Sequence, residues 1–284
     1  MSYFEPDTYK LQSAGKDWSY AADGSTMRFE LRPGDRWAKD SDGSVERSEL
    51  ASYKTLDYEQ TYTISYKFMI EPGETNTSKW IVLGQLHATE DAGDDGVSPP
   101  YGLDLIGERM EIHARWSDQA DTNWDNVNTL VAYKDEQDIE RGHWYDMKVT
   151  LRLDPFGDGM LDVWRDGVQL VDYDGPLGYH DEVGPYWKHG AYRKASDETI
   201  AVNYKDFSLV EEAGGQTPLA LEAQSDFEVL HDPPGRFAGV ASALKDQLDL
   251  YADMFAEGIV DTGSFGSADV FQKALENSRT DFVL

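Results

Sequence analysis

The chain has 284 residues, of which 54 are acidic and 25 are basic, and its formal net charge is -29. Such a surface repels nucleic acids and anionic membranes, so we expect neither as a partner. The sequence contains no apolar run of the roughly 18 residues that a membrane-spanning helix needs. It also contains no cysteine, which excludes disulfides and a cysteine-ligated zinc site.

Residues 1–210 show the pattern of many short β-strands. Apolar and polar residues alternate with a period of two in residues 27–31, 62–69 and 147–153. This alternation is typical of antiparallel strands with one buried face. Asp166-Gly167 and Gly107-Glu108 each separate two such runs and predict two-residue hairpin turns, the second of type II′. Short strands with intervening turns and few helical periods predict a sandwich or jelly roll.

Two strand segments place polar side chains two residues apart, and therefore on one face. Arg47 and Glu49 form one such pair, and Gln85 and His87 form the other at the end of an apolar run. Each pair also has a plain structural reading. Arg47 and Glu49 could be an ion pair within one strand, and a histidine at a strand end is commonly a surface residue.

A third strand segment, residues 186–194, has two faces of different character. One face carries Tyr186, Lys188, Gly190, Tyr192 and Lys194. Phenols and ammonium groups are poor material for a hydrophobic core. They would suit a floor under an anionic, hydroxyl-rich ligand, with Gly190 leaving room for the ligand near the backbone. The alternative is a solvent-exposed strand face.

Together the three segments resemble the motifs of polysaccharide lyases with a β-jelly-roll fold. The motifs are Arg47-Ser-Glu-Leu50, Gly84-Gln-Leu-His87 and Tyr186-Trp-Lys-His-Gly-Ala-Tyr-Arg193. Their order and approximate spacing resemble most the heparin lyase I-like group, with alginate and glucuronan lyases sharing the pattern more loosely. The resemblance covers about residues 25–210. It implies an all-β fold, a concanavalin-like β-jelly-roll sandwich. It also implies an enzyme that cleaves a uronic-acid polymer by β-elimination and requires no cofactor.

β-Elimination at a uronic acid requires withdrawal of charge from the C6 carboxylate, removal of the C5 proton and protonation of the O4 leaving group. We expect Arg47 to hold the carboxylate through charge-assisted hydrogen bonds. Gln85 is expected to donate an amide hydrogen bond to the same group, where negative charge develops. Glu49 is expected to orient Arg47.

Tyr192 and His87 are the candidates for proton transfer. The resemblance implies that Tyr192 is the acid, and also the base when the elimination is syn. His87 would be the base when the C5 proton lies on the opposite face of the sugar. Because a free tyrosine has a pKa of about 10, Tyr192 would act as a base only beside a cation such as Lys188 or Arg47.

Further residues are candidates for contact with substrate or with a metal ion. The substrate-binding candidates are Tyr186, His113, Arg115, Asn123 and Trp124. Trp124 could stack on a sugar ring or anchor its loop. Two acidic turns, Asp40-Ser-Asp42-Gly43 and Asp91-Ala-Gly-Asp94-Asp95-Gly96, supply oxygen ligands suited to structural Ca²⁺, although ordinary turns explain them as well. No catalytic metal is expected.

The C-terminal part of the sequence differs from the rest. Residues 211–218 have the composition of a linker, and residues 219–284 show amphipathic helical periods, which predict a small α-helical appendage. Residues 1–11 lack the pattern of a cleavable secretory signal. The acidic and apolar C-terminus resembles the uncleaved signals of bacterial type I secretion, so we expect a secreted protein. We also expect a monomer. A helical segment that docks on the sandwich is the alternative.

Two other functions fit part of the sequence. A glycoside hydrolase would need paired carboxylates, and Glu136, Asp138 and Glu140 do alternate, but in a polar stretch. A lectin-like carbohydrate-binding module would need neither Tyr192 nor His87. The expected partner is an anionic polysaccharide. Because the β domain is acidic on balance, a non-sulfated polymer such as glucuronan, alginate or an acidic exopolysaccharide fits better than heparin.

Overall fold

The computed structural model describes residues 8–40 and 43–212. Fourteen β-strands account for the regular structure of these residues, and no helix occurs among them. None of the described residues therefore belongs to a helix long and apolar enough to cross a membrane. The predicted linker beyond residue 212, the α-helical appendage and the export signal lie outside the described residues.

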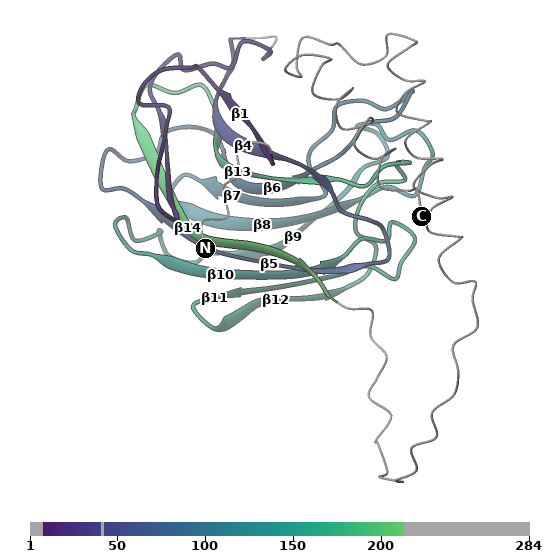
Figure 1. Ribbon diagram of the computed structural model, residues 1–284. Helices are drawn as coiled ribbons and strands as arrows, with labels where there is room; N and C mark the ends of the chain where they lie inside the picture. Colours follow the sequence, from purple (N-terminus) through teal and green to yellow (C-terminus); the bar gives the residue numbers. More distant parts are fainter. Residues whose placement is uncertain (1–7, 41–42, 213–284) are drawn as a thin grey trace, which may run out of the picture. The chain divides into compact units, whose positions relative to one another are not determined.

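The strands form two antiparallel seven-stranded sheets that pack face to face (Figure 1). The first sheet has the order β1 (Tyr9–Ser13), β4 (Val45–Thr55), β13 (Tyr186–Lys194), β6 (Ile81–His87), β7 (Tyr101–Ile106), β8 (Arg109–Trp116) and β9 (Asn128–Lys134). The second sheet has the order β12 (Val168–Asp174), β11 (Met160–Arg165), β10 (Tyr145–Arg152), β5 (Thr61–Ile70), β14 (Ile200–Glu211), β3 (Thr26–Leu31) and β2 (Tyr20–Asp23). The predicted all-β sandwich is confirmed.

The hydrophobic core lies between the two sheets, and the period-two pattern explains it. Along β5 every second residue, from Tyr62 to Ile70, is buried and the intervening residues are half-buried. Burial of each such side chain contributes roughly 1.5–3 kcal/mol. On β13 the residues that face the core are Trp187, His189 and Ala191, so the opposite face of this strand is the one that carries Lys188 and Tyr192.

The turn chemistry also agrees with the sequence. Asp166 and Gly167 both have positive φ, 52° and 79°, as a type I′ turn between β11 and β12 requires. Between β7 and β8, Gly107 has a φ of 62° and Glu108 is not among the residues with positive φ, which matches the predicted type II′ turn.

Gly190 has a different role from the one expected. Its φ is 138°, and a Cβ atom there would approach the Cα of Glu49 on β4 to 2.7 Å. The register of β13 against β6 is also irregular between His189 and Tyr192. Gly190 is therefore required by the close approach of β4, not by a ligand. The hydroxyl of Tyr204 on β14, in the second sheet, donates a hydrogen bond to the carbonyl oxygen of Gly190 at 2.9 Å.

Candidate active site

A cavity of about 520 Å³ lies on the first sheet, on the face turned away from the core. We call it the groove. Side chains of β4, β6, β7, β8 and β13 form its floor, and residues from the loops 88–100 and 117–127 form its walls. Of the predicted catalytic residues, Arg47, Gln85, His87 and Tyr192 line the groove.

A buried carboxylate, that of Glu49, lies beneath the groove floor and is bonded to two of its lining residues. It accepts hydrogen bonds from Nη1 of Arg47 at 2.9 Å and from Nε2 of Gln85 at 2.7 Å. It also pairs with Nζ of Lys188 at 2.9 Å. Strand register brings these groups together, because Glu49 faces Gly190 on β13 while Lys188 faces Gln85 on β6.

The charges in this cluster balance one another. Burial opposes ionisation of Glu49, but Lys188, Arg47 and the hydrogen bond from Gln85 outweigh burial and lower the pKa of Glu49. Burial lowers the pKa of Lys188, and Glu49 opposes this shift. Only 1% of the Lys188 side chain is exposed, so its ammonium group serves Glu49. It does not form part of an open cationic floor, as the alternation along β13 alone had suggested.

Arg47 is held from several sides. Its Nη2 lies 3.1 Å from Oδ1 of Asp40, and its Nη1 also donates to Oε1 of Gln12 at 3.3 Å. The guanidinium carbon lies 3.8 Å from the centre of the Tyr192 ring, a close cation–π contact. Most donors of Arg47 are thus engaged within the protein, which leaves less capacity for the bidentate grip on a substrate carboxylate expected from the sequence.

Tyr192 lies between two groups on the groove surface. Arg47 covers one side of its ring, and the ring of Trp80 meets it edge to face with centroids 5.0 Å apart. Both neighbours line the groove with Tyr192. The contacts fix the ring and place a permanent cation beside it.

His87 has a defined protonation pattern. Its Nδ1 lies 2.9 Å from the carbonyl oxygen of Ala88, and a carbonyl only accepts, so Nδ1 carries the hydrogen. Burial and the nearby Lys188 lower the pKa of His87, which keeps the ring neutral. The lone pair of the neutral ring is therefore on Nε2. Tyr186 stacks on the ring with centroids 5.2 Å apart, and burial raises its own pKa to about 12, so Tyr186 supports His87 as a neutral phenol.

His113 and Arg115 of β8 line the groove further along the sheet. Nδ1 of His113 lies 2.9 Å from Oδ2 of Asp104, a contact without the angle of a hydrogen bond. Nη1 of Arg115 donates to the carbonyl oxygen of Pro99 at 2.8 Å, and burial lowers the pKa of Arg115. Both predicted substrate-binding residues thus lie at the groove, and each is held by a neighbour.

The loop 117–127 brings one of its two candidate residues to the groove. Trp124 lines the groove and is 63% exposed, an unusual fraction for so large an apolar side chain. Asn123 is not a lining residue. Its Oδ1 accepts from the backbone N–H of Asp125 at 3.0 Å, so it shapes the loop.

Sequence reasoning missed four residues that define this site. Gln12 and Asp40 hold Arg47, Trp80 packs on Tyr192, and Asp104 lies beside His113. Two signals were available: Trp80 opens the apolar run that ends in His87, and Asp104 is the charged residue in the otherwise uncharged strand 101–106. The partners of Arg47 carry no such signal. Asp40, considered above as part of a calcium turn, is engaged with Arg47, and Asp42 lies outside the described residues.

The carboxylates expected for a hydrolase do not meet in a site. Glu136, Asp138 and Glu140 lie in the connection between β9 and β10, are exposed and are not among the residues that line the groove. Asp138 contacts Arg109 on the surface at 3.3 Å. The alternation seen in the sequence is that of a solvated loop.

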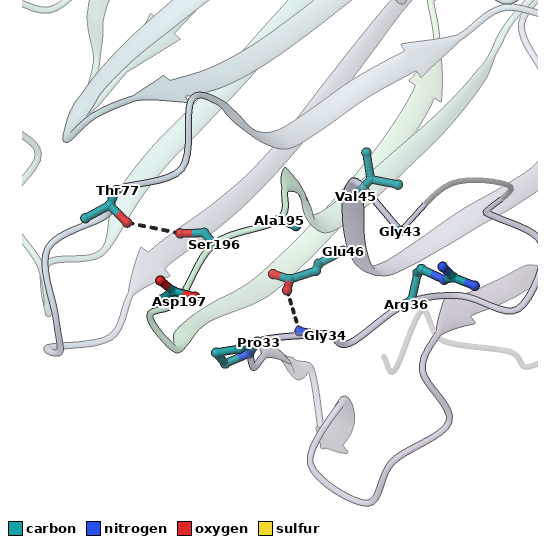
Figure 2. Close-up of a pocket in the computed structure, with 10 residues that line it drawn as sticks. All are labelled: Pro33, Gly34, Arg36, Gly43, Val45, Glu46, Thr77, Ala195, Ser196 and Asp197. Atoms are coloured by element: carbon teal, nitrogen blue, oxygen red, sulfur yellow. Dashed lines mark hydrogen bonds between the residues drawn. The ribbon is translucent and has the colours of Figure 1, made fainter.

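A second hollow of about 440 Å³ lies where β4 begins and β13 ends (Figure 2). Glu46 on its wall accepts from the backbone N–H of Gly34 at 2.5 Å and from Nε of Arg193 at 2.6 Å. Glu198 accepts from Oγ1 of Thr77 at 2.6 Å, and its hydrogen bonds outweigh burial and lower its pKa to about 2. Glu46 on the wall and the nearby Glu198 are thus engaged within the protein, and none of the predicted site residues lines this hollow.

The groove on the outer face of the β-sandwich thus brings His87, Gln85, Arg47 and Tyr192 together. A model of the family described as polysaccharide lyase matches residues 10–208, and the chain therefore belongs to this family. The resemblance noted in the sequence is confirmed, and the protein is a polysaccharide lyase. No curated protein sequence matches the chain.

Solved structures show the same fold. The endo-β-1,4-glucuronan lyase of the fungus Trichoderma reesei has a TM-score of 0.55 at 10% identity, over 74% of this chain and 88% of its own. Alginate lyase AlgAT5 of polysaccharide lyase family 7 has a TM-score of 0.50 at 15% identity, over 72% and 95%. A substrate complex of the family 7 alginate lyase A1-II′, with one histidine and one tyrosine replaced, has a TM-score of 0.50 at 15% identity, over 74% and 95%.

Proposed function

We propose that the protein cleaves a non-sulfated polyuronate in the groove, with His87 as the base and Tyr192 as the acid. The observation that carries this assignment is the hydrogen bond from Nδ1 of His87 to the carbonyl oxygen of Ala88. It leaves Nε2 of a neutral imidazole as the proton acceptor, on a residue that lines the same groove as Tyr192.

The proposed reaction moves two protons and breaks one bond. Nε2 of His87 takes the C5 proton, the C–H electrons form the C4–C5 double bond, and the C4–O4 bond breaks. The leaving O4 takes the hydroxyl proton of Tyr192, so the products are an unsaturated uronate and a free hydroxyl end. The alginate lyase A1-II′ substrate complex has one histidine and one tyrosine replaced, and these residue types support the assignment.

The charge that develops on the uronate carboxylate needs a donor between the acid and the base. Gln85 is placed for this role, because it lies two residues before His87 on β6 and lines the groove. One of its two amide hydrogens is bound to Glu49 at 2.7 Å, and the second remains for the substrate. Arg47 acts beside Tyr192, where its cation favours the phenolate that forms when O4 is protonated.

The charge of the groove supports a non-sulfated substrate. Among the described residues that line it, Arg47 and Arg115 are matched by Glu90 and Asp104. A sulfated chain, with several negative charges per disaccharide, would need an excess of cations. One carboxylate per sugar fits a groove whose fixed charges balance. The similar structures named for glucuronan and alginate support the same class of polymer.

Ultraviolet absorbance over time tests the proposal, because elimination creates a conjugated uronate that absorbs and hydrolysis does not. The panel contains glucuronan, polymannuronate, polyguluronate and heparin. We expect one of the non-sulfated polymers to give a rise in absorbance. Tyr192→Phe and His87→Asn should each lower kcat by about 10²–10⁴-fold on that polymer.

Matched controls replace the same residue types away from the groove. Tyr20→Phe, on β2 of the second sheet, and His143→Asn, in an exposed turn, should leave kcat unchanged. Activity retained in His87→Asn but lost in Tyr192→Phe would assign both proton transfers to Tyr192 and overturn the role of His87. A rise only with heparin would overturn the proposed polymer class.

A further inference from the structure

Three carboxylates from two distant segments meet beside the groove. Asp91 and Asp94 lie in the loop 88–100, and Asp181 lies in the segment between β12 and β13. One ligand oxygen from each residue lies within 4.8 Å of the others. Two oxygens bound to one Ca²⁺ at about 2.4 Å can be at most about 4.8 Å apart, so this spacing fits a shared calcium ion.

Asp181 gives an independent indication of a missing cation. Its side chain is buried, with 7% of the residue exposed. Within residues 8–40 and 43–212, its Oδ2 has no hydrogen-bond partner. A buried carboxylate oxygen without a partner is costly, and native proteins rarely leave one unless an ion or water satisfies it.

The other carboxylates are already oriented by the backbone. Oδ1 of Asp94 accepts from the N–H of Thr122 at 2.6 Å, and its Oδ2 accepts from the N–H of Asp91 at 2.7 Å. Oδ2 of Asp91 accepts from the N–H of Glu182 at 2.7 Å. These bonds fix the two side chains. Each carboxylate oxygen has more than one lone pair, so it can still bind an ion.

We propose that Asp91, Asp94 and Asp181 bind one Ca²⁺ ion, which joins the loop 88–100, one wall of the groove, to the segment between β12 and β13. The loop 88–100 also supplies residues 96–99 to the groove, and Thr122 lies two residues before Trp124. An ion at the three carboxylates would therefore fix the loop 88–100 directly, and it would hold the loop 117–127 through the hydrogen bond from Thr122 to Asp94. Calcium fits better than magnesium, because it accepts irregular sets of carboxylate and backbone oxygens, whereas Mg²⁺ requires near-ideal octahedral geometry.

Isothermal titration calorimetry with CaCl₂ on the full chain, purified with a chelator, tests the site directly. We expect one ion per chain, tighter binding of Ca²⁺ than of Mg²⁺, and a rise in Tm of about 5–10 °C at a hundredfold excess over Kd. Asp181→Asn, which keeps the shape of the side chain, should weaken calcium binding at least tenfold and abolish the rise in Tm. Asp94→Asn should do the same.

Asp95→Asn is the matched control, because Asp95 is exposed in the same acidic turn but does not belong to the cluster. It should bind Ca²⁺ like the parent protein. Absence of binding heat and of a Tm shift in the parent protein would overturn the proposal, as would an equal shift in Asp181→Asn. Equal affinity for Mg²⁺ would overturn the assignment of calcium.

The link to the groove has its own test. Removal of Ca²⁺ should raise KM for the polymer several-fold and leave kcat nearly unchanged, because the ion holds the loop 88–100 at the groove and does not contact the reacting atoms. An unchanged KM would overturn this link. Calcium binding is measured without substrate, so its outcome is independent of whether the proposed polymer is correct.

Discussion

Two lysine–carboxylate pairs with the same 2.9 Å distance lie in the two sheets, in opposite environments. Lys188 and Glu49 in the first sheet are each 1% exposed. Lys67 and Asp146 in the second sheet are 36% and 57% exposed. The outer pair lies in water, where both groups keep most of their hydration. The inner pair has lost that hydration and depends on its partners.

The difference follows from what covers each sheet. On β5 of the second sheet, burial alternates with the strand period, and the outward side chains face solvent. On β6 of the first sheet, six consecutive residues from Ile81 to Leu86 are buried, although Gln85 among them is polar. On the polar face of the first sheet, the side chains of Gln85, Glu49 and Lys188 are buried and bond to one another instead of to water. Desolvation of that network opposes folding, and its benefit is a fixed arrangement of donors for catalysis.

The largest effect expected from this comparison is on stability. Glu49→Gln should destabilise the protein by about 3–5 kcal/mol, because the substitution leaves Lys188 charged and buried without its counter-ion. Urea unfolding measures the change at constant m-value. Asp146→Asn in the second sheet should leave the unfolding midpoint unchanged within error.

A double variant shows whether the stability lost in Glu49→Gln comes from the unpaired charge of Lys188 or from disturbed packing. Glu49→Gln combined with Lys188→Met removes both charges and should recover most of the stability lost in Glu49→Gln, since a buried pair replaced as a whole is nearly neutral. Equal destabilisation by Glu49→Gln and Asp146→Asn would contradict the contrast between the two sheets.

A smaller effect is expected from the core face of β13. Burial lowers the pKa of His189 to about 3 from an ordinary 6.5. Below pH 6.5 the unfolded chain takes up a proton at this residue and the folded protein does not, so stability is full above pH 6.5 and falls progressively toward pH 3. The loss between pH 6.5 and pH 5 should be about 2 kcal/mol.

His189→Phe isolates this contribution. The new ring keeps the stacking on Phe207, whose centroid lies 5.0 Å from that of His189. The free energy of unfolding is measured at pH 7 and pH 5 for the parent protein and for His189→Phe. The titration of His87 and Asp181 affects both proteins equally, so it cancels when the two pH dependences are subtracted. Parallel pH dependences would show that His189 does not contribute.

The alternation of side chains along a strand is a local property, and it correctly predicted which face of β13 carries Tyr192 and Lys188. The environment of Lys188 was not predictable, because Glu49 reaches it only through the pairing of two strands that are distant in sequence. Asp181 joins Asp91 and Asp94 for the same reason. The tautomer of His87 depends on where one backbone carbonyl points, which a residue pattern does not encode.

The smallest effect concerns Trp124, the exposed side chain on the groove wall. Trp124→Ala should raise KM for the polymer about fivefold, which corresponds to about 1 kcal/mol of lost stacking on a sugar ring, and should leave kcat unchanged. Phe156→Ala is the matched control, because Phe156 is 64% exposed against 63% for Trp124 and does not line the groove. Initial rates over a range of polymer concentrations separate the two parameters. A fivefold rise in both variants would show a general loss of apolar surface, whereas a rise in Trp124→Ala alone places a sugar subsite at the wall of the groove.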